Sequence, residues 1–372
     1  MAKPEPIVAI TADGVDLTAS SYGAKAVGLQ KLMRLGLRVP PAFVVSVEAA
    51  PAVASGDHRP LLQSTVAALA ASKDDRLAVR SGAEFSLPGA FETMLDVVPE
   101  VTQAAVAAVV ESSHGLRVST IAAAMGHDRV PETAVVIQRQ VDATLDSRSG
   151  SGAASSRHPV TGVRGVNGSF VWQTSGDAVM AGTVPVMALD AMASRLPDVF
   201  EELSQALARL DRELDSAVEL EFTVESGVLW HLQLRQFVVT PPDADQLPGR
   251  AEVLASGLAA SAGIGYGFLH VDVDDALDAI EAGQPVVLAI ETSSPADVGA
   301  MTKVAGVMTV LGGRESHAAV VTRSAGVPAV LAVQGLEIGA DHIVLGGRRV
   351  DAGTELWVDG TTGRVAGLRS RP

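Results

Sequence analysis

Several features are absent or scarce in the sequence, and each absence excludes a class of protein. The chain has no cysteine, which excludes disulfides, thiolate catalysis and zinc sites built from cysteine. Aromatic residues make up only 3%, too few for the stacking platforms that bind single-stranded nucleic acid. The net charge of -15 argues against non-specific binding to nucleic acid or to anionic membranes.

Long apolar runs are also missing. No run approaches the roughly 18 apolar residues that a membrane-spanning helix needs. The start, MAKPEPIVAITADG, has no apolar signal-peptide segment after its early lysine. We therefore expect a soluble, cytoplasmic protein.

Hydrophobic residues, by contrast, are abundant. They make up 47% of the 372 residues, and the mean hydropathy of +0.28 is too high for a disordered chain. This length allows two or three domains, with cores built from Ala, Val and Leu. The proline-rich stretch VVTPPDADQLPGR, residues 238–250, is the clearest linker, and about 120 residues follow it, a common domain size.

Apolar spacing and the positions of Gly and Pro predict alternating helices and strands. The stretch SRSGSGAASSRHP (147–159) is small and polar, which is typical of a loop, and 170–186 suggests a hairpin. This alternation indicates an α/β and α+β multidomain protein. Helices are expected at 25–36, 61–72, 100–126 and 197–214, and strands at 40–47, 77–82, 134–141 and, as a pair, 218–235.

The stretch GGRESHAAVVTRSAGVPAV begins at Gly312 and places His317 at the start of a predicted helix. Gly312 and Gly313 permit a tight turn with positive φ, and Ser316 is a good N-cap. Free N–H groups and the positive dipole end of a helix favour a neutral histidine and a phosphoryl group attached to it. A histidine that caps the helix, or is buried with satisfied nitrogens, is the alternative.

Charged residues upstream suggest a Mg-nucleotide site, although GAKAVGLQ lacks the GK[ST] of a Walker A loop and GIGYG opens no helix. Glu219 and Glu221 share one face of a predicted strand, where carboxylates suit the hard cation and cationic groups suit the phosphates. A solvent-facing strand edge that carries charges is the alternative. The other candidates are Gln233 and Arg235 on the next strand, Lys25 at a helix start, Arg80 at a strand end and Arg157 in the small-residue loop.

Several stretches together resemble the pyruvate phosphate dikinase and phosphoenolpyruvate (PEP) synthase family. YGAKAVGLQKLMRLGLRVPPAFVV is similar to its GGKGANL helix and PPGF strand, and LAVRSGAEFSLPGAFETMLDV to its VRSG...PG...T.LN segment. SGSGAASSRHPVTGVRG resembles its SGTG...TRNP.TG loop, and VELEFTVESGVLWHLQLR its D-x-E-F...LW.LQ.R strands. LAASAGIGYGFL, VVLAIETSSPADVGAM and GGRESHAAVVTRSAGVPAV resemble its swivelling phosphohistidine domain in order. The resemblance covers nearly the whole chain, and an ordered set is far more specific than one motif.

This resemblance implies an ATP-grasp nucleotide-binding domain at 1–238, a linker or hinge at 239–251 and a swivelling β/β/α phosphohistidine domain at 252–372. It implies ATP and Mg2+ as cofactors. In the family mechanism, His317 attacks the β-phosphoryl of ATP and AMP departs. A phosphohistidine remains after the terminal phosphate passes to phosphate or water, and the remaining phosphoryl then goes to an acceptor, which would be pyruvate.

The resemblance also assigns roles to single residues. His317 would carry the phosphoryl group and would be catalytic together with Arg80 and Arg235. Glu219 and Glu221 would bind the metal, and the loop from Ser81 to Thr93 would cover the phosphates. The residues implied to bind Mg-ATP are Lys25, Arg80, Gln138 near the adenine, Arg157 and Asp177 near the phosphates, Glu219, Glu221, Gln233 and Arg235.

The chain departs from the family pattern at several positions. The family's Asp of D-x-E is Glu219, and a glutamate of its GEF strand is Ser169, so one possible metal or phosphate contact is lost. The threonine before Ser-His, a regulatory phosphorylation site in some dikinases, is Glu315. We expect that form of regulation to be absent, and an added negative charge beside His317 to slow its phosphorylation.

The expected acceptor site is the other departure. Pyruvate dikinases and PEP synthases continue into a TIM barrel that binds pyruvate, whereas this chain stops at Pro372. We therefore expect the acceptor site on a separate barrel protein. The alternatives are a different small acceptor, as in the related rifampin phosphotransferase, and a non-catalytic ATP-binding or phosphocarrier subunit that regulates a partner.

Overall fold

The computed structural model describes residues 3–70, 72, 74–85, 87, 90–239, 247–249 and 251–368, apart from five helical side chains, among them that of Asp177. The chain forms two compact units. Unit 1 comprises Met1–Ser149 and Leu220–Arg235, and unit 2 comprises Gly150–Glu219 and Gln236–Pro372. Most of the predicted linker and part of the predicted phosphate loop therefore lie outside the described residues.

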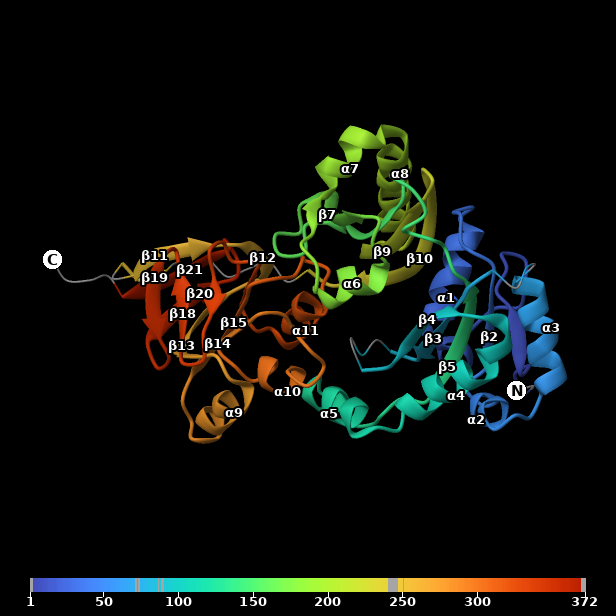
Figure 1. Cartoon of the computed structure of the whole chain (residues 1–372), viewed down its shortest axis with the longest axis horizontal. Coiled ribbons are helices and arrows are strands. Elements are labelled where there is room, and N and C mark those ends of the chain that lie inside the picture. Colours follow the sequence, from blue (N-terminus) through green and yellow to red (C-terminus); the bar gives the residue numbers. More distant parts are fainter. Residues whose placement is uncertain are drawn as a thin grey trace. The chain divides into compact units, whose positions relative to one another are not determined.

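An antiparallel sheet with the strand order β1-β2-β5-β3-β4 lies at the centre of unit 1 (Figure 1). The strands of this sheet are β1 (Ile7–Ala9), β2 (Ala42–Val45), β3 (Leu77–Ala83), β4 (Thr93–Val97) and β5 (Thr133–Arg139). The helices are α1 (Ala19–Arg34), α2 (Ala50–Ala54), α3 (Arg59–Leu69), the 3-10 turn η1 (Pro99–Val101), α4 (Thr102–Ser112) and α5 (Leu116–Ala124). The expected helix over 100–126 is thus two helices.

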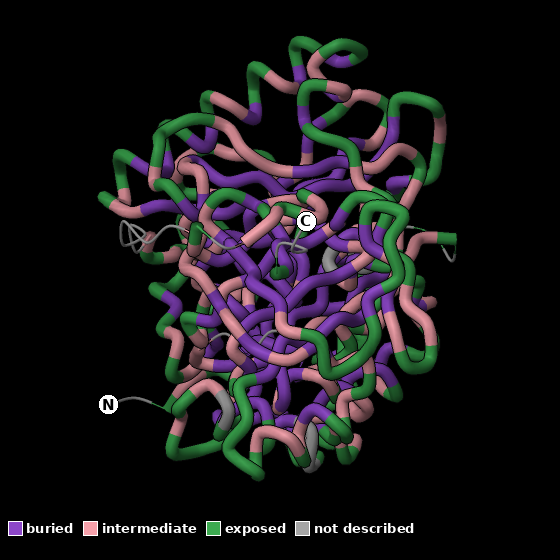
Figure 2. The backbone as a smooth tube through the Cα atoms, turned by 90° about the vertical axis from the view of Figure 1, so that its left-hand side faces the viewer, coloured by how far each residue is buried: buried purple, intermediate pink, exposed green. Residues whose placement is uncertain are grey.

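The core of unit 1 forms where apolar strands meet helices. β5 contributes Val135 and Ile137, which are fully buried with Leu77 and Val79 of the neighbouring strand β3. Figure 2 shows the buried residues, in purple, gathered in the interior of the molecule, whereas many segments at its outside are exposed and green. This burial fixes the positions from which the polar side chains of unit 1 project.

A close backbone contact between Gly23 and Gly82 positions the part of α1 that carries Lys25. Gly23 has φ 78° and interrupts the helix, and a Cβ at this position would lie 1.8 Å from the carbonyl oxygen of Gly82. Only glycine allows both the left-handed φ and this approach. The kink therefore brings the helical turn that carries Lys25 against β3.

The hairpin predicted at 218–235 is confirmed. It consists of β9 (Ala217–Glu225) and β10 (Val228–Phe237), joined at Ser226 and Gly227, which have φ of 50° and 80°. Positive φ at both central residues is the conformation of the type I′ turn, whose twist matches that of the strands.

The first part of unit 2 differs from the sequence expectation at two places. Residues 147–159 were expected to form a loop, but β6 (Gly150–Arg157) is a buried strand that pairs with β7 (Arg164–Trp172). Its small residues permit close packing, since a Cβ at Gly150 would lie 2.5 Å from the Phe170 ring. The hairpin expected at 170–186 is also wrong, because a helix, α6 (Gly176–Ala181), lies between β7 and the short strand β8 (Met187–Ala188).

Two helices complete this part of unit 2. They are α7 (Leu189–Arg195) and the expected amphipathic helix α8 (Pro197–Glu213), which lie beside one another in Figure 1.

The second part of unit 2 is built on an eight-stranded sheet with the order β11-β21-β20-β13-β14-β15-β16-β12. Strands β13, β14, β15 and β16 are neighbours in that order and run parallel to one another. All other pairings in this sheet are antiparallel. The strands are β11 (Ala251–Ser256), β12 (Leu258–Ser261), β13 (Ile264–His270), β14 (Val286–Ile290), β15 (Gly306–Thr309), β16 (Ala329–Leu331), β20 (Glu355–Asp359) and β21 (Arg364–Leu368).

Three helices and a small sheet accompany these strands (Figure 1). They are α9 (Val273–Glu281), α10 (Val298–Met301), α11 (His317–Ala325) and the strands β17 (Glu337–Ile338), β18 (His342–Leu345) and β19 (Arg348–Asp351). The predicted mixed α/β architecture is therefore confirmed. In the described part of the chain, no helix combines the length and apolarity needed to cross a membrane.

Candidate functional site

Five of the predicted nucleotide ligands come together in unit 1. The Arg80 guanidinium on β3 contacts the Glu221 carboxylate at 3.0 Å, and Arg235 of β10 contacts its other oxygen at 3.1 Å. Arg80 also donates to the Gln233 side-chain oxygen at 3.2 Å. Lys25 lies near enough to these charges to interact with all three of them electrostatically. We call Lys25, Arg80, Glu221, Gln233 and Arg235 the cation cluster.

The cation cluster is largely shielded from water. The side chains of Arg80, Glu221 and Arg235 are only 11%, 12% and 21% exposed. Burial alone would raise the pKa of the Glu221 carboxyl, but Arg235, Arg80 and Lys25 together hold it below its usual value. Burial lowers the pKa of Lys25 well below its usual value, and Arg80 lowers it further. Three basic groups thus share one carboxylate, although the chain as a whole carries a charge of -15.

No hydrogen bond or ion pair joins Gln138 to the cation cluster in the described part of unit 1. It lies on β5 with 2% of its surface exposed, and its amide donates to the carbonyl oxygen of Pro40 at 3.2 Å. Its assignment to the adenine stays a prediction.

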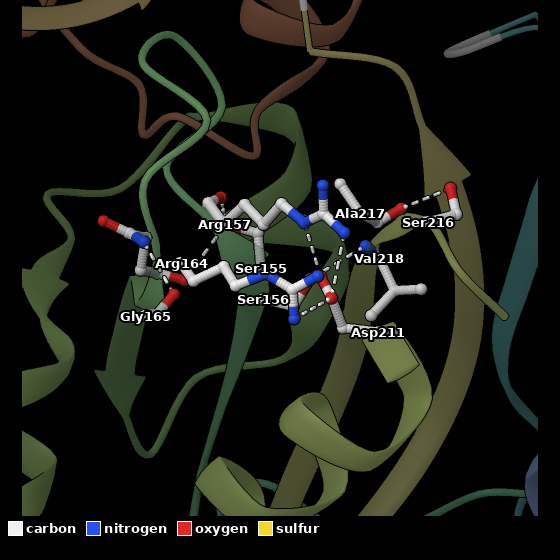
Figure 3. Close-up of polar contacts among 10 residues, drawn as sticks. Ser155, Ser156, Arg157, Arg164, Gly165, Asp211, Ser216, Ala217 and Val218 are labelled. Carbon is white, nitrogen blue, oxygen red and sulfur yellow. Dashed lines mark hydrogen bonds and ion pairs between the residues drawn. The ribbon is translucent and has the colours of Figure 1, made fainter. Parts of the chain in front are cut away.

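Arg157 in unit 2 is held by a residue that the sequence analysis missed. Figure 3 shows the Asp211 carboxylate of α8 between Arg157 and Arg164. Its oxygens accept from Arg157 Nε at 2.7 Å and Nη2 at 2.9 Å, and from Ser156 Oγ at 2.7 Å. These hydrogen bonds, Arg157 first, lower the pKa of Asp211, which is only 2% exposed.

The bidentate contact fixes the Arg157 guanidinium at the end of β6. The signal for Asp211 was present in the sequence, because this acid lies among the buried positions of amphipathic α8. Asp177 lies in α6, but its side chain is outside the described residues.

The predicted start of the histidine helix is confirmed, since α11 begins at His317 and ends at Gly326, whose φ is 68°. Ser316 occupies the N-cap position, but its hydroxyl makes no capping hydrogen bond. The helix follows parallel strand β15 through residues 310–316, which we call the histidine loop. His317 is half-buried. It therefore lies beyond the carboxyl end of a parallel strand, where α/β folds commonly bind ligands.

The histidine loop is surrounded by charges within unit 2. Arg323 donates to the Arg314 carbonyl oxygen at 2.6 Å, and its guanidinium lies 3.9 Å from the Glu219 carboxylate. Glu315 is 2% exposed, and burial and then Glu219 raise the pKa of its carboxyl to about 7. The negative charge expected beside His317 is therefore partly neutralised near neutral pH.

The two predicted metal ligands suit Mg2+ in kind but are paired with cations. Mg2+ in nucleotide sites commonly takes one or two carboxylates together with phosphate oxygens. Glu221 already faces two guanidinium groups, and Glu219 faces Arg323. Among the described residues, no three acidic or histidine side chains are grouped to hold a metal by themselves. These carboxylates could contribute to a metal site only together with the nucleotide.

Comparisons with known proteins find similarity in the second part of unit 2 and over a longer stretch of the chain. Residues 282–363, which include His317, match the family described as "PEP-utilising enzyme, mobile domain". The sequence is 30% identical over 271 residues to pyruvate, phosphate dikinase of Clostridium symbiosum, which corresponds to 63% of this chain and 31% of that protein. Pyruvate, phosphate dikinase 2 of Zea mays is 31% identical over the same shares of the two chains.

Over 63% of its length the sequence is therefore similar to pyruvate, phosphate dikinases, in line with the motifs described above. It spans about a third of the length of these curated relatives, because the matched part covers 31% of each.

Solved structures add limited similarity. Enzyme I, solved by NMR, is 34% identical over 22% of this chain and 29% of that chain, with a TM-score of 0.17. D-Alanine-D-alanine ligase from Helicobacter pylori is 10% identical, covers 59% of this chain and 54% of that chain, and has a TM-score of 0.32. TM-scores this low do not establish a shared fold.

Proposed function

We propose that the protein is an ATP-dependent phosphotransferase of the dikinase type, in which His317 receives the β-phosphoryl group of ATP and AMP is released. In this proposal residues 1–238 form an ATP-grasp nucleotide-binding domain and 239–251 a hinge. Residues 252–372 form the phosphohistidine domain, within which the family match lies. The kinship with pyruvate, phosphate dikinases supports this division.

The observation that carries the proposal is the excess of positive charge in the cation cluster. Lys25, Arg80 and Arg235 face one carboxylate, Glu221, in a shielded environment. An added polyphosphate would balance this excess, and burial would strengthen each charge-assisted hydrogen bond. The lowered pKa of Lys25 also indicates an anion site, because a bound phosphate would raise this pKa again.

The reaction would proceed by in-line displacement at the β-phosphorus. A neutral imidazole nitrogen of His317 forms the new N–P bond, the bond from phosphorus to the α,β-bridging oxygen breaks, and AMP leaves with that oxygen. The diphosphoryl group on the histidine then loses its terminal phosphate to phosphate or water. The N-terminal N–H groups of α11 stabilise the phosphohistidine that remains.

The chain's own residues would divide the remaining work. Arg80 and Arg235 would spread the charge of the phosphates, and Gln233 would orient Arg80 through the hydrogen bond described above. Mg2+, held by Glu219 and Glu221 with the nucleotide, would neutralise phosphate charge. Arg157, fixed by Asp211, and Asp177 are proposed to lie near the phosphates, and Gln138 near the adenine.

We further propose that the phosphoryl group passes to pyruvate on a separate barrel protein. The support is the similarity to dikinases, because the relatives described above are named for pyruvate and phosphate. Incubating phosphorylated protein with pyruvate and extracts of the source cells, then assaying PEP, tests this step. PEP formation that needs a fraction separable from this chain is the expected result, and formation by the chain alone would overturn the separate acceptor.

The first half-reaction is tested with ATP labelled at the β-phosphoryl. We expect acid-labile label on the protein and AMP as the nucleotide product. Arg235→Ala should abolish both, whereas Arg348→Ala, at a half-exposed arginine on β19, is the matched control and should not. ATP binding without AMP formation under any condition would instead indicate a nucleotide-binding regulatory subunit.

A further inference from the structure

Two of the positions at which the chain departs from the dikinase pattern are in direct contact within unit 2. The hydroxyl of Ser169 on β7 donates to Oε2 of Glu315 in the histidine loop at 2.9 Å. Both residues are buried, with 5% and 2% of their surfaces exposed. The second oxygen of Glu315 is buried and has no hydrogen-bond partner, so the bond from Ser169 is the one that satisfies this carboxyl.

The backbone around this pair approaches closely. A Cβ at Gly313 would lie 2.9 Å from the Ser169 hydroxyl, which is closer than packing allows. A Cβ at Gly182, after α6, would lie 3.2 Å from Cα of Gly312 in the histidine loop. Thr292 donates to the carbonyl oxygens of Ala181 and Gly182, both at 3.2 Å. The histidine loop thus lies against β7 and the end of α6 through a small, specific surface.

The chemistry of the pair is specific. The hydrogen bond needs one hydroxyl and one carboxyl, which Ser169 and Glu315 supply. A hydrogen bond between hydroxyl and carboxylate is preserved when the two groups exchange places. A change at one position alone would leave two hydroxyls or two carboxylates in contact, and the second combination is strongly unfavourable in a buried site.

We propose that Ser169 and Glu315 are positioning residues that seat the histidine loop on β7 and thereby place His317 for phosphoryl transfer. This inference rests on the proposed function of His317. The charged groups around Glu315 are Glu219 of β9, Arg314 of the same loop and Arg323 of α11. Ser169 is the only neutral donor to this carboxyl among the described residues, so the contact between the histidine loop and β7 depends on this hydrogen bond.

The seating is tested first without any reference to activity. Hydrogen exchange of the full chain should show faster exchange of amides 311–320 in Ser169→Ala and Glu315→Ala, by about tenfold, a typical effect of losing one buried hydrogen bond. The double variant should be no worse than either single variant. Ser194→Ala, which removes an exposed hydroxyl within α7, is the matched control and should leave these amides unchanged.

Activity then tests the positioning role. Ser169→Ala should reduce the rate of phosphohistidine formation about tenfold while the Kd for Mg-ATP stays unchanged, since the nucleotide is held by the cation cluster of unit 1. The conservative Glu315→Gln keeps an acceptor for Ser169 and should retain most of the rate. Ser169→Glu should be more damaging than Ser169→Ala, and adding Glu315→Thr to it should restore both protection and rate.

The outcomes separate this inference from the proposed function. If the wild type forms no phosphohistidine, the function fails, whereas the exchange experiment still decides whether the pair seats the loop. Unchanged exchange in Ser169→Ala, or additive effects in the double variant, would overturn the seating. Faster exchange with an unchanged rate of phosphorylation would overturn the positioning role.

Discussion

Removing the one carboxylate of the cation cluster should destabilise unit 1 by a predictable amount. Glu221→Gln keeps the shape of the side chain but deletes its charge, which pairs with Arg80 at 3.0 Å and with Arg235 at 3.1 Å. Because these side chains are at most 21% exposed, water cannot replace the lost charge. Breaking a buried pair in this way costs about 3 kcal/mol of unfolding free energy.

The assay uses a tryptophan that belongs to unit 1. Trp230 lies on β10, whereas the other two tryptophans, Trp172 and Trp357, lie in unit 2. Urea unfolding followed by fluorescence, with Trp172 and Trp357 replaced by phenylalanine, therefore reports on unit 1. Glu48→Gln is the matched control within unit 1, because Glu48 pairs at 2.7 Å with Lys3 and both side chains are substantially exposed. Its loss should change stability by less than about 1 kcal/mol.

A polyanion should reverse the effect of Glu221→Gln. Tripolyphosphate supplies the negative charge that the variant lacks, and ligand at 100 times its Kd stabilises the folded state by about 2.7 kcal/mol. We therefore expect tripolyphosphate to stabilise the variant more than the wild type. A variant as stable as the wild type, or one that tripolyphosphate does not stabilise, would refute the assignment of this cluster as an anion site.

Three further predictions concern single groups. The lowered pKa of Lys25 should let amine reagents modify it at a pH at which a lysine of ordinary pKa is protonated and unreactive, and Mg-ATP should abolish this modification. Asp211→Asn should lower the urea concentration at which unit 2 unfolds, because Arg157 loses the carboxylate that holds its guanidinium. The raised pKa of Glu315 means that the folded state holds a proton that the unfolded state releases. Stability should therefore fall as pH rises from 4.5 to about 7, by up to about 3 kcal/mol, and Glu315→Gln should remove this slope in urea unfolding measured across that range.

Local patterns in the sequence were sufficient to predict several helices and strands. Apolar spacing with Ser316 before it and Gly326 after it placed α11, and the Ser226–Gly227 turn placed the β9–β10 hairpin. The family motifs pointed to the five residues that the structure brings together in the cation cluster. These signals succeed because helix ends and tight turns depend on residues within a few positions of one another.

Features that depend on distant residues were missed. The small, polar residues of β6 resemble a loop, and their burial follows only from the close approach of β7. Asp211 reaches Arg157 across 54 positions, and Ser169 reaches Glu315 across 146. No local pattern encodes such pairs, although an acid on the buried face of α8 was a sign that a cation lies opposite.

Intact-protein mass spectrometry after incubation with Mg-ATP tests whether His317 carries the phosphoryl group. We expect the added mass of one phosphoryl group, lost on acid treatment, absent from His317→Ala, and formed together with AMP. An unmodified protein, ADP as the sole nucleotide product, or the same modification in His317→Ala would contradict it.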